Sequence, residues 1–132
     1  MAGLTLCGHR QGGVDVLTVA GELDVWSGPQ LGESLAGLAA LGRDRVVLDA
    51  VGLGFCDAFG IRSLVAGAAG ARGRHGWLRL AGVNRQLSRV LVIAGVSGVL
   101  PMFDSVQDAI AGVRDSPGPR LARDAGERLA AA

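Results

Sequence analysis

The apolar run "RVVLDA" at residues 45–50 restricts the fold of this chain more than any other feature of its sequence. A continuous run of this kind is typical of a strand that is covered on both faces, as strands of parallel sheets are. Leucine-type residues at helical spacing precede it and follow it. A buried strand between two helices predicts an α/β fold in which this run is a central strand.

The remaining segments extend this alternation. We expect strands in "LTLCG", "VDVLTVAG" and "WLRLAGV", a short strand near "VLPMF", and helices over about 29–41, 58–69, 85–94 and 105–113. The glycines of "HRQGG" suit a turn between two antiparallel strands. The sequence therefore predicts a mainly parallel sheet of four to five strands, with an antiparallel N-terminal edge and about four helices. The connection "VGLGFCDAF" should leave the central strand at the end of the sheet where α/β proteins usually place their sites.

Length and composition predict one folded domain. The chain has 132 residues, of which 49% are hydrophobic and 19% charged, and this is enough apolar material for a single core. From residue 115 onward two prolines, mixed charges and few large apolar groups change the character of the sequence. We expect a domain over 1–114 and a flexible C-terminal tail over 115–132.

Charge and hydropathy argue against several classes of function. Thirteen arginines face twelve acidic residues, so the formal net charge is only +1, which favours binding neither to nucleic acid nor to an anionic membrane. The chain has no lysine, which excludes a P-loop. Its longest apolar run is well short of the roughly 20 residues that span a bilayer. With no secretory signal recognisable at the N-terminus, we expect a cytoplasmic protein.

Catalytic and metal-binding patterns are not evident in the sequence. Cys7 and Cys56 lack zinc-type spacing, and we interpret both as small buried hydrophobic residues. Asp24, Asp49 and Asp57 should lie near one end of the sheet, but no histidine, cysteine nucleophile or metal-ligand set accompanies them there. We therefore expect no enzymatic activity, no metal and no cofactor.

The stretch "FCDAFGI" at 55–61 contains the most informative residues. Asp57 is a suitable N-cap for a helix that begins directly after it. Phe59 has no role in capping. It is either a core residue that tucks under the loop or an exposed residue that contacts a partner, and the sequence leaves both open.

Three segments together resemble one family. "GELD" at 21–24, "VVLDAVGLGFCDAFGIRSL" at 46–64 and "LVIAGVSGVLPMFDSVQDAI" at 91–110 resemble STAS domains, in particular bacterial anti-sigma factor antagonists. The resemblance implies a non-enzymatic switch protein whose partner is an anti-sigma factor with serine kinase activity. In that family the unphosphorylated antagonist binds the anti-sigma factor and so frees sigma, and phosphorylation of a serine at the start of the second helix reverses this.

The family motif at that position runs Asp, Ser, Ser or Thr, Gly. Asp57 and Gly60 match it, whereas Ala58 stands where the phosphoacceptor serine is expected and Phe59 occupies the second hydroxyl position. No phosphoacceptor is thus predicted in this loop. The candidate partner-binding residues that the resemblance implies are Asp24, Asp57, Ala58, Phe59, Gly60 and Arg62.

Two functions remain open at this stage. The first is an anti-sigma factor antagonist that binds a kinase-type anti-sigma factor without the usual phosphorylation switch. The second is a STAS scaffold, or an accessory subunit of a larger signalling or transporter assembly. A weak homodimer is a further expectation.

Overall fold

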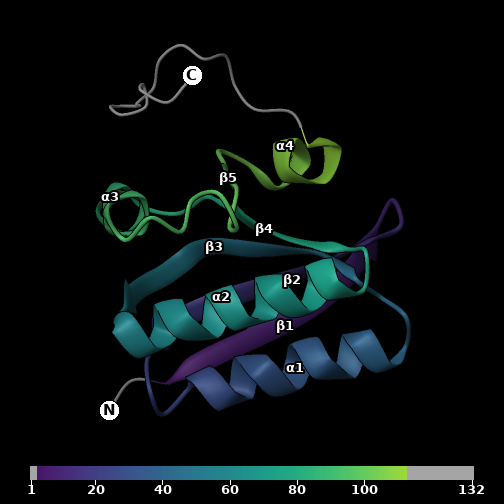
Figure 1. Ribbon diagram of the computed structural model, residues 1–132, viewed down its shortest axis with the longest axis horizontal. Helices are drawn as coiled ribbons and strands as arrows, with labels where there is room; N and C mark the ends of the chain where they lie inside the picture. Colours follow the sequence, from purple (N-terminus) through teal and green to yellow (C-terminus); the bar gives the residue numbers. More distant parts are fainter. Residues whose placement is uncertain (1–2, 113–132) are drawn as a thin grey trace.

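The computed structural model describes residues 3–112, which form a five-stranded sheet flanked by helices (Figure 1). The strands are β1 (Leu4–Gln11), β2 (Val14–Leu23), β3 (Arg45–Cys56), β4 (Trp77–Ala81) and β5 (Met102–Phe103), and the helices are α1 (Gly28–Ala40), α2 (Ala58–Gly73), α3 (Arg85–Ile93) and α4 (Val106–Ala111). The strands follow one another across the sheet in chain order. β1 pairs antiparallel with β2, and every later pair is parallel. The predicted fold class is confirmed.

Two clusters of buried side chains hold the sheet to its helices. The larger cluster joins one face of the sheet to α1, α2 and α3, and its fully buried members include Leu31, Leu64 and Leu91. The smaller cluster lies under α4 and includes Val47 and Phe103. Residues of β3 contribute to both clusters, which is why the sequence of this strand is apolar without interruption.

The central strand is longer than predicted. We expected the chain to leave the strand after "RVVLDA", but β3 continues to Cys56 and stays paired with β2 as far as Leu23. The pairing shifts register twice along this stretch. A Cβ on Gly52 would come within 2.9 Å of the Ala20 side chain, so glycine lets the irregular strand stay close to its neighbour. The expected loop is therefore mostly strand, and only its last residues begin the helix.

The prediction that Cys7 is buried was wrong. Cys7 is exposed, because side chains alternate along the edge strand β1. Leu4 and Leu6 point to the larger core cluster. Cys7 directly follows Leu6, opposite Thr18 in the pairing of β1 with β2, and therefore lies on the other face.

Helix boundaries agree well with the capping signals of the sequence. The side chain of Asn84 accepts a hydrogen bond from the Leu87 amide at the start of α3, and Ser105 does the same for Asp108 in α4. Helix α2 is longer than the predicted range of about 58–69, and it ends at Gly73. The predicted tail over 115–132, like the last position of the helix predicted over 105–113, lies outside the described residues.

Candidate partner-binding surface

Asp57 fixes the point at which α2 leaves the sheet. Its backbone is extended, and its carboxylate accepts a hydrogen bond from the Gly60 amide at 2.9 Å, as expected for an N-cap. The Asp57 amide in turn donates to the carbonyl of Leu23, the last residue of β2, at 3.2 Å. The first turn of α2 is thus attached to the end of the neighbouring strand.

Gly60 is needed for close packing between α2 and the sheet. A Cβ at this position would clash with the Leu23 carbonyl oxygen and lie 2.7 Å from the Cys56 sulfur. Gly60 is buried. It was predicted as a partner-binding residue, but the structure gives it a role inside the protein, where it lets the first turn of α2 lie directly on β2 and β3.

Asp24 organises the loop between β2 and α1. Its carboxylate accepts hydrogen bonds from the amides of Trp26, at 2.9 Å, and Ser27, at 3.0 Å. These bonds, led by the one from the Ser27 amide, lower the pKa of Asp24 below its usual value. The Asp24 carbonyl also accepts from the Gly28 amide, at 2.8 Å. Asp24 therefore orders the residues just before α1, a helix for which Ser27 provides no side-chain cap.

This loop and the start of α2 lie side by side. Leu23 pairs with Cys56 at the end of the parallel ladder between β2 and β3, and both connections leave the sheet from there. Gly28, at the start of α1, approaches Ser63 so closely that a Cβ on it would lie 2.5 Å from the Ser63 hydroxyl. The structure thus brings the neighbourhoods of Asp24 and Asp57 to one end of the sheet, at the left of Figure 1.

Large apolar side chains are exposed at this same end. Phe59 is 49% exposed and Phe55 52%, and in the adjoining loop Val25 is 47% and Trp26 76% exposed. Of the two interpretations that the sequence left open for Phe59, the structure excludes burial in the core. We call these four residues, Val25, Trp26, Phe55 and Phe59, the apolar end surface.

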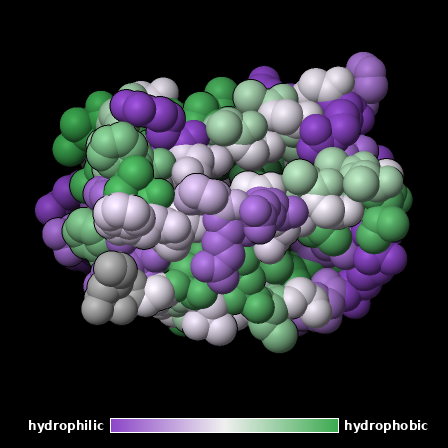
Figure 2. Space-filling view, turned by 90° about the horizontal axis from the view of Figure 1, so that it is seen from below, coloured by the Kyte–Doolittle hydropathy of each residue, from purple (hydrophilic) through white to green (hydrophobic). Residues whose placement is uncertain are grey.

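Sequence reasoning missed three of the four residues of this surface. Phe55 was assigned to a loop without a role, and Val25 and Trp26 were passed over between a strand and a helix. The available signal was Trp26, which lies between Asp24 and Pro29, because a large ring in a short loop rarely reaches the core. Figure 2 shows another face of the molecule, on which hydrophobic and hydrophilic residues are interspersed.

The remaining predicted residues lie at the border of the apolar end surface. Ala58 is the exposed first residue of α2. The guanidinium of Arg62 lies over the Phe59 ring, 5.4 Å from its centroid, an attractive cation–π arrangement. Arg62 is exposed and gives the apolar ring a positively charged neighbour.

Cys56, next to Asp57, is poorly suited to nucleophilic chemistry. Burial, and secondarily the negative charge of Asp57, raise the pKa of its thiol to about 12. Within residues 3–112 no group of three His, Cys, Asp or Glu side chains is arranged to hold a metal ion.

The amino-acid sequence of this chain matches a known protein family. Residues 8–102 match the family model described as "Mlab, STAS domain". The chain belongs to the STAS domain family. The match includes the Asp24 loop and the first turn of α2, so the apolar end surface is part of the STAS domain itself.

Solved structures of several other proteins share the fold. An anti-sigma factor antagonist from Mycobacterium paratuberculosis is 23% identical, with a TM-score of 0.74, over 85% of this chain and 95% of that protein. A putative anti-sigma factor antagonist from Thermotoga maritima is 16% identical, with a TM-score of 0.73, over 82% and 93%. The murine anion transporter Solute Carrier 26 family member A9 is 19% identical, with a TM-score of 0.66, and the match covers 79% of this chain but only 18% of the transporter.

A comparison of this STAS chain with curated proteins found no match. Among residues 3–112, none of the helices has the length and apolar character needed to cross a membrane.

Proposed function

We propose that this STAS protein is a cytoplasmic anti-sigma factor antagonist, which binds a kinase-type anti-sigma factor through the apolar end surface and thereby releases a sigma factor. The observation that carries the proposal is the exposure of Val25, Trp26, Phe55 and Phe59 together at the start of α2. Exposed aromatic rings are enriched among the residues that dominate the energetics of protein interfaces. The solved antagonists with this fold support the choice of partner class.

In this proposal the protein binds the anti-sigma factor constitutively, because the usual phosphorylation switch is missing. Ala58 has no hydroxyl at the position where the resemblance places the phosphoacceptor. The nearest hydroxyl in α2 belongs to Ser63, which donates to the Phe59 carbonyl at 3.1 Å and lies against Gly28. Ser27 is buried, and its hydroxyl donates to the Glu22 carbonyl at 2.8 Å. A kinase would have to open either site before it could phosphorylate it.

A second function has its own support. The family model carries the description "Mlab, STAS domain", and one protein with this fold is an anion transporter in which the match is a small part of the chain. Under this alternative the apolar end surface would hold the domain in a larger assembly, as a scaffold or an accessory subunit.

The experiment that tests the proposal is affinity capture from a native lysate followed by measurement with the purified partner. We expect the wild type to retain a protein of the serine-kinase anti-sigma class. Phe59→Ala and Trp26→Ala should each weaken the purified complex by roughly 2 kcal/mol in calorimetry, the loss typical of an interface hot spot. Leu41→Ala, which also removes an exposed apolar side chain but at the far end of α1, is the matched control and should bind normally.

Two results would contradict this function. Capture of membrane transporter subunits in place of an anti-sigma factor would favour the accessory-subunit alternative. Unchanged affinity in both ring variants, with circular dichroism showing the native fold, would remove the apolar end surface from the interface.

A further inference from the structure

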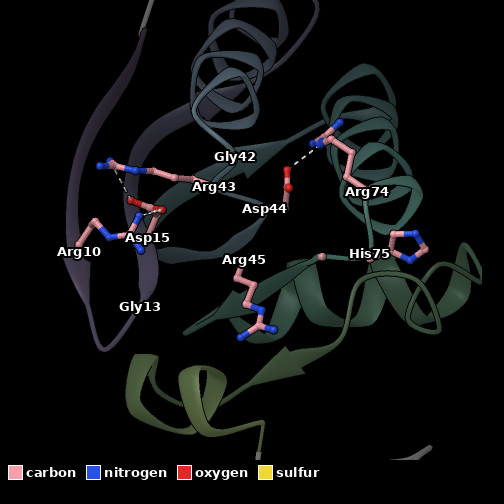
Figure 3. A pocket seen from close by; sticks show the side chains of 10 residues that line it. Arg10, Gly13, Asp15, Gly42, Arg43, Asp44, Arg45, Arg74 and His75 are labelled. Atoms are coloured by element: carbon pink, nitrogen blue, oxygen red, sulfur yellow. Dashed lines mark hydrogen bonds and ion pairs between the residues drawn. The ribbon is translucent and has the colours of Figure 1, made fainter.

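Strand β1 forms an open edge of the sheet. It is the outermost strand at its side and, among the described residues, pairs only with β2, over eight residues and without a register shift. The strand contains no proline, and the side chain of Arg10 turns away from the edge to pair with Asp15 at 3.1 Å (Figure 3). Natural proteins usually protect edge strands with prolines, bulges or outward charges. Strand β1 has none of these features over residues 4–9.

Two hydrogen bonds identify the backbone groups of β1 that face outward. The Gly3 carbonyl accepts from the Glu22 amide of β2 at 3.2 Å, so Gly3 faces β2. The Leu4 carbonyl accepts from the Gln30 side chain of α1 at 3.0 Å, so Leu4 faces away from β2. Because this direction alternates along an antiparallel strand, every second residue after Leu4 also faces outward, namely Leu6, Gly8 and Arg10. Within residues 3–112 the amides and carbonyls of these three residues have no partner on the outer side.

An apolar groove lies beside this edge. It has a volume of about 490 Å³ and runs between β1 and the second half of α1, where Leu38 and Leu41 line it. Gly8 also lines the groove, and a Cβ at this position would meet the Leu17 side chain at 3.6 Å. The missing side chain of Gly8 thus leaves the groove open toward the edge. An open edge with an adjoining apolar groove is suited to an added strand, which forms backbone hydrogen bonds along the edge and places alternate side chains in the groove.

The sequence of β1 itself complements this groove. Leu4 is buried, whereas Leu6 is only partly buried and keeps apolar surface free on the same face of the sheet as Gly8. When a second β1 is paired antiparallel about a two-fold axis at Cys7, Leu6 of each copy lies opposite Gly8 of the other. Each leucine then covers the groove that the opposite glycine leaves open. Such a self-complementary contact is what a two-fold interface requires.

The same two-fold arrangement brings unlike charges together. At the hairpin end of β1, Arg10 and Arg43 pair with Asp15 in a polar cavity of about 260 Å³ (Figure 3). The other end of β1 contacts α1 through Gln30, and the one charged residue of α1 is Glu33. Glu33 is exposed and forms no ion pair within residues 3–112. Antiparallel pairing brings the basic hairpin end of one copy toward this acidic residue of the other and keeps the two hairpin ends apart.

We propose that the open edge of β1 binds a second copy of this chain, so that the two sheets join into one. Backbone hydrogen bonds connect Leu6 of each copy with Gly8 of the other. Cys7 lies on the two-fold axis, opposite its own counterpart. The dimer is weak, because few bonds and a small surface hold it together, and Cys7 therefore stays accessible in dilute protein. The interface goes beyond the proposed function, since it uses no residue of the apolar end surface.

Oxidative cross-linking of the full chain tests the register of this dimer, with Cys7 as the reporter. Residues that oppose each other without hydrogen bonds in an antiparallel pair have Cα atoms about 4.5 Å apart, which is within the range of a disulfide. Diamide at high protein concentration should therefore convert the wild type to a disulfide-linked dimer, measured by intact mass without reductant. Cys7→Ser should remain monomeric in the same experiment, because Cys56 is half-buried.

Two variants with a displaced thiol are the matched controls for cross-linking. Thr5→Cys and His9→Cys, each combined with Cys7→Ser, keep an exposed thiol on the same face of β1. Neither variant should cross-link with itself, because an offset of four residues, or about 14 Å, would separate the two thiols. A mixture of the two variants should cross-link, because Thr5 of one copy lies opposite His9 of the other.

Sedimentation of the reduced protein tests the dimer without a covalent link. Gly8→Pro removes an amide that faces the second copy and has no part in the pairing of β1 with β2, and proline is tolerated at such positions of edge strands. This variant should keep the native circular dichroism and lose the dimer that the wild type forms as its concentration rises. Gly8→Ala keeps the amide and has room for its methyl group, so it should still form the dimer.

Each of three outcomes would overturn the proposal. The first is a reduced wild type that stays monomeric at millimolar concentration. The second is equal dimer formation by Gly8→Pro and Gly8→Ala, which would place the contact elsewhere on the molecule. The third is cross-linking of the Thr5→Cys and His9→Cys variants, each with itself, as efficiently as the wild type, which would show random collision in place of a defined register.

Discussion

Two neighbouring residues, Cys56 and Asp57, show how much the local environment changes the chemistry of a side chain in this protein. The Asp57 carboxylate accepts a hydrogen bond from the Gly60 amide, and Asp57 thereby caps the start of α2 directly after β3. The Cys56 thiol lies beside it, half-buried against α2. In contrast, Cys7 lies exposed on the edge strand.

We predict that thiol reagents distinguish the two cysteines. A pKa of about 12 leaves Cys56 almost entirely protonated at neutral pH, so labelling by iodoacetamide should be roughly a hundredfold slower at Cys56 than at an exposed thiol. Intact-mass analysis of the native protein at pH 8 should show one rapid modification, and Cys7→Ser should abolish it. Rapid labelling of Cys56 in the Cys7→Ser variant would contradict the shielding of this thiol.

A second prediction concerns Ala58. The wild type, incubated with a cognate anti-sigma kinase and ATP, should gain no phosphate by intact mass. Ala58→Ser should gain one, because the new hydroxyl follows Asp57 at a helix N-terminus, where amides and the helix dipole stabilise a phosphate. The added charge should then weaken binding of the partner.

Ser63→Ala is the control for the phosphorylation experiment. Like the wild type, this variant should show no increase in mass after incubation with the kinase and ATP. Phosphorylation of the wild type at Ser63 would contradict constitutive binding. A stoichiometric phosphate at Ser27 or Ser105 would show instead that the switch has moved to another site.

At the scale of elements, the loop between β2 and α1 depends on one side chain. Asp24 accepts the amides of Trp26 and Ser27 and so holds the turn that presents Trp26 to solvent. The same turn places the first residues of α1 against α2. The exposed ring of Trp26 is thus held in place by hydrogen bonds of the loop backbone.

We predict that Asp24→Ala loosens this turn and weakens partner binding, whereas Asp24→Asn, which keeps an acceptor oxygen, retains most of the affinity. The pKa of Asp24 is lowered below 3.8 in the folded protein. Its ionised form therefore stabilises the fold above that pH, and the contribution is lost as the pH falls through the lowered pKa.

Urea unfolding measured at pH 6 and at about pH 2.5 tests this dependence. Asp24→Ala should be less stable than the wild type at pH 6, and the difference should shrink at the acidic pH. A difference of the same size at both values would show that the Asp24 charge has no part in holding the turn.

At the scale of the whole molecule, the two ends of the sheet carry different chemistry. The connections that leave β2 and β3 expose apolar rings, and the connections that enter β3 and β4 gather arginines. The rigid parallel strands and the core that they share with α1 and α2 separate the two ends.

Much of the fold could be predicted from the sequence because its signals are local. The apolar run 45–50, the helical spacing of leucines and the capping residues Asp57, Asn84 and Ser105 each depend on neighbours within a few positions. The end of β3 could not be predicted in the same way. Glycines 52 and 54 favour a loop by their own propensities, and only the pairing with β2 keeps them in a strand.

The sequence by itself determined the α/β class, the position of Asp57 at the start of α2 and the absence of a hydroxyl at position 58, since these depend on residue identity and local spacing. Only the tertiary structure decided which side chains reach the surface. Phe59 is exposed and Cys7 is exposed, because exposure depends on which face of an element its neighbours cover. It also decided that Val25 and Trp26 lie beside the start of α2, and that arginines from three separate connections meet in one cavity, because parallel strands bring together segments that are far apart in the chain.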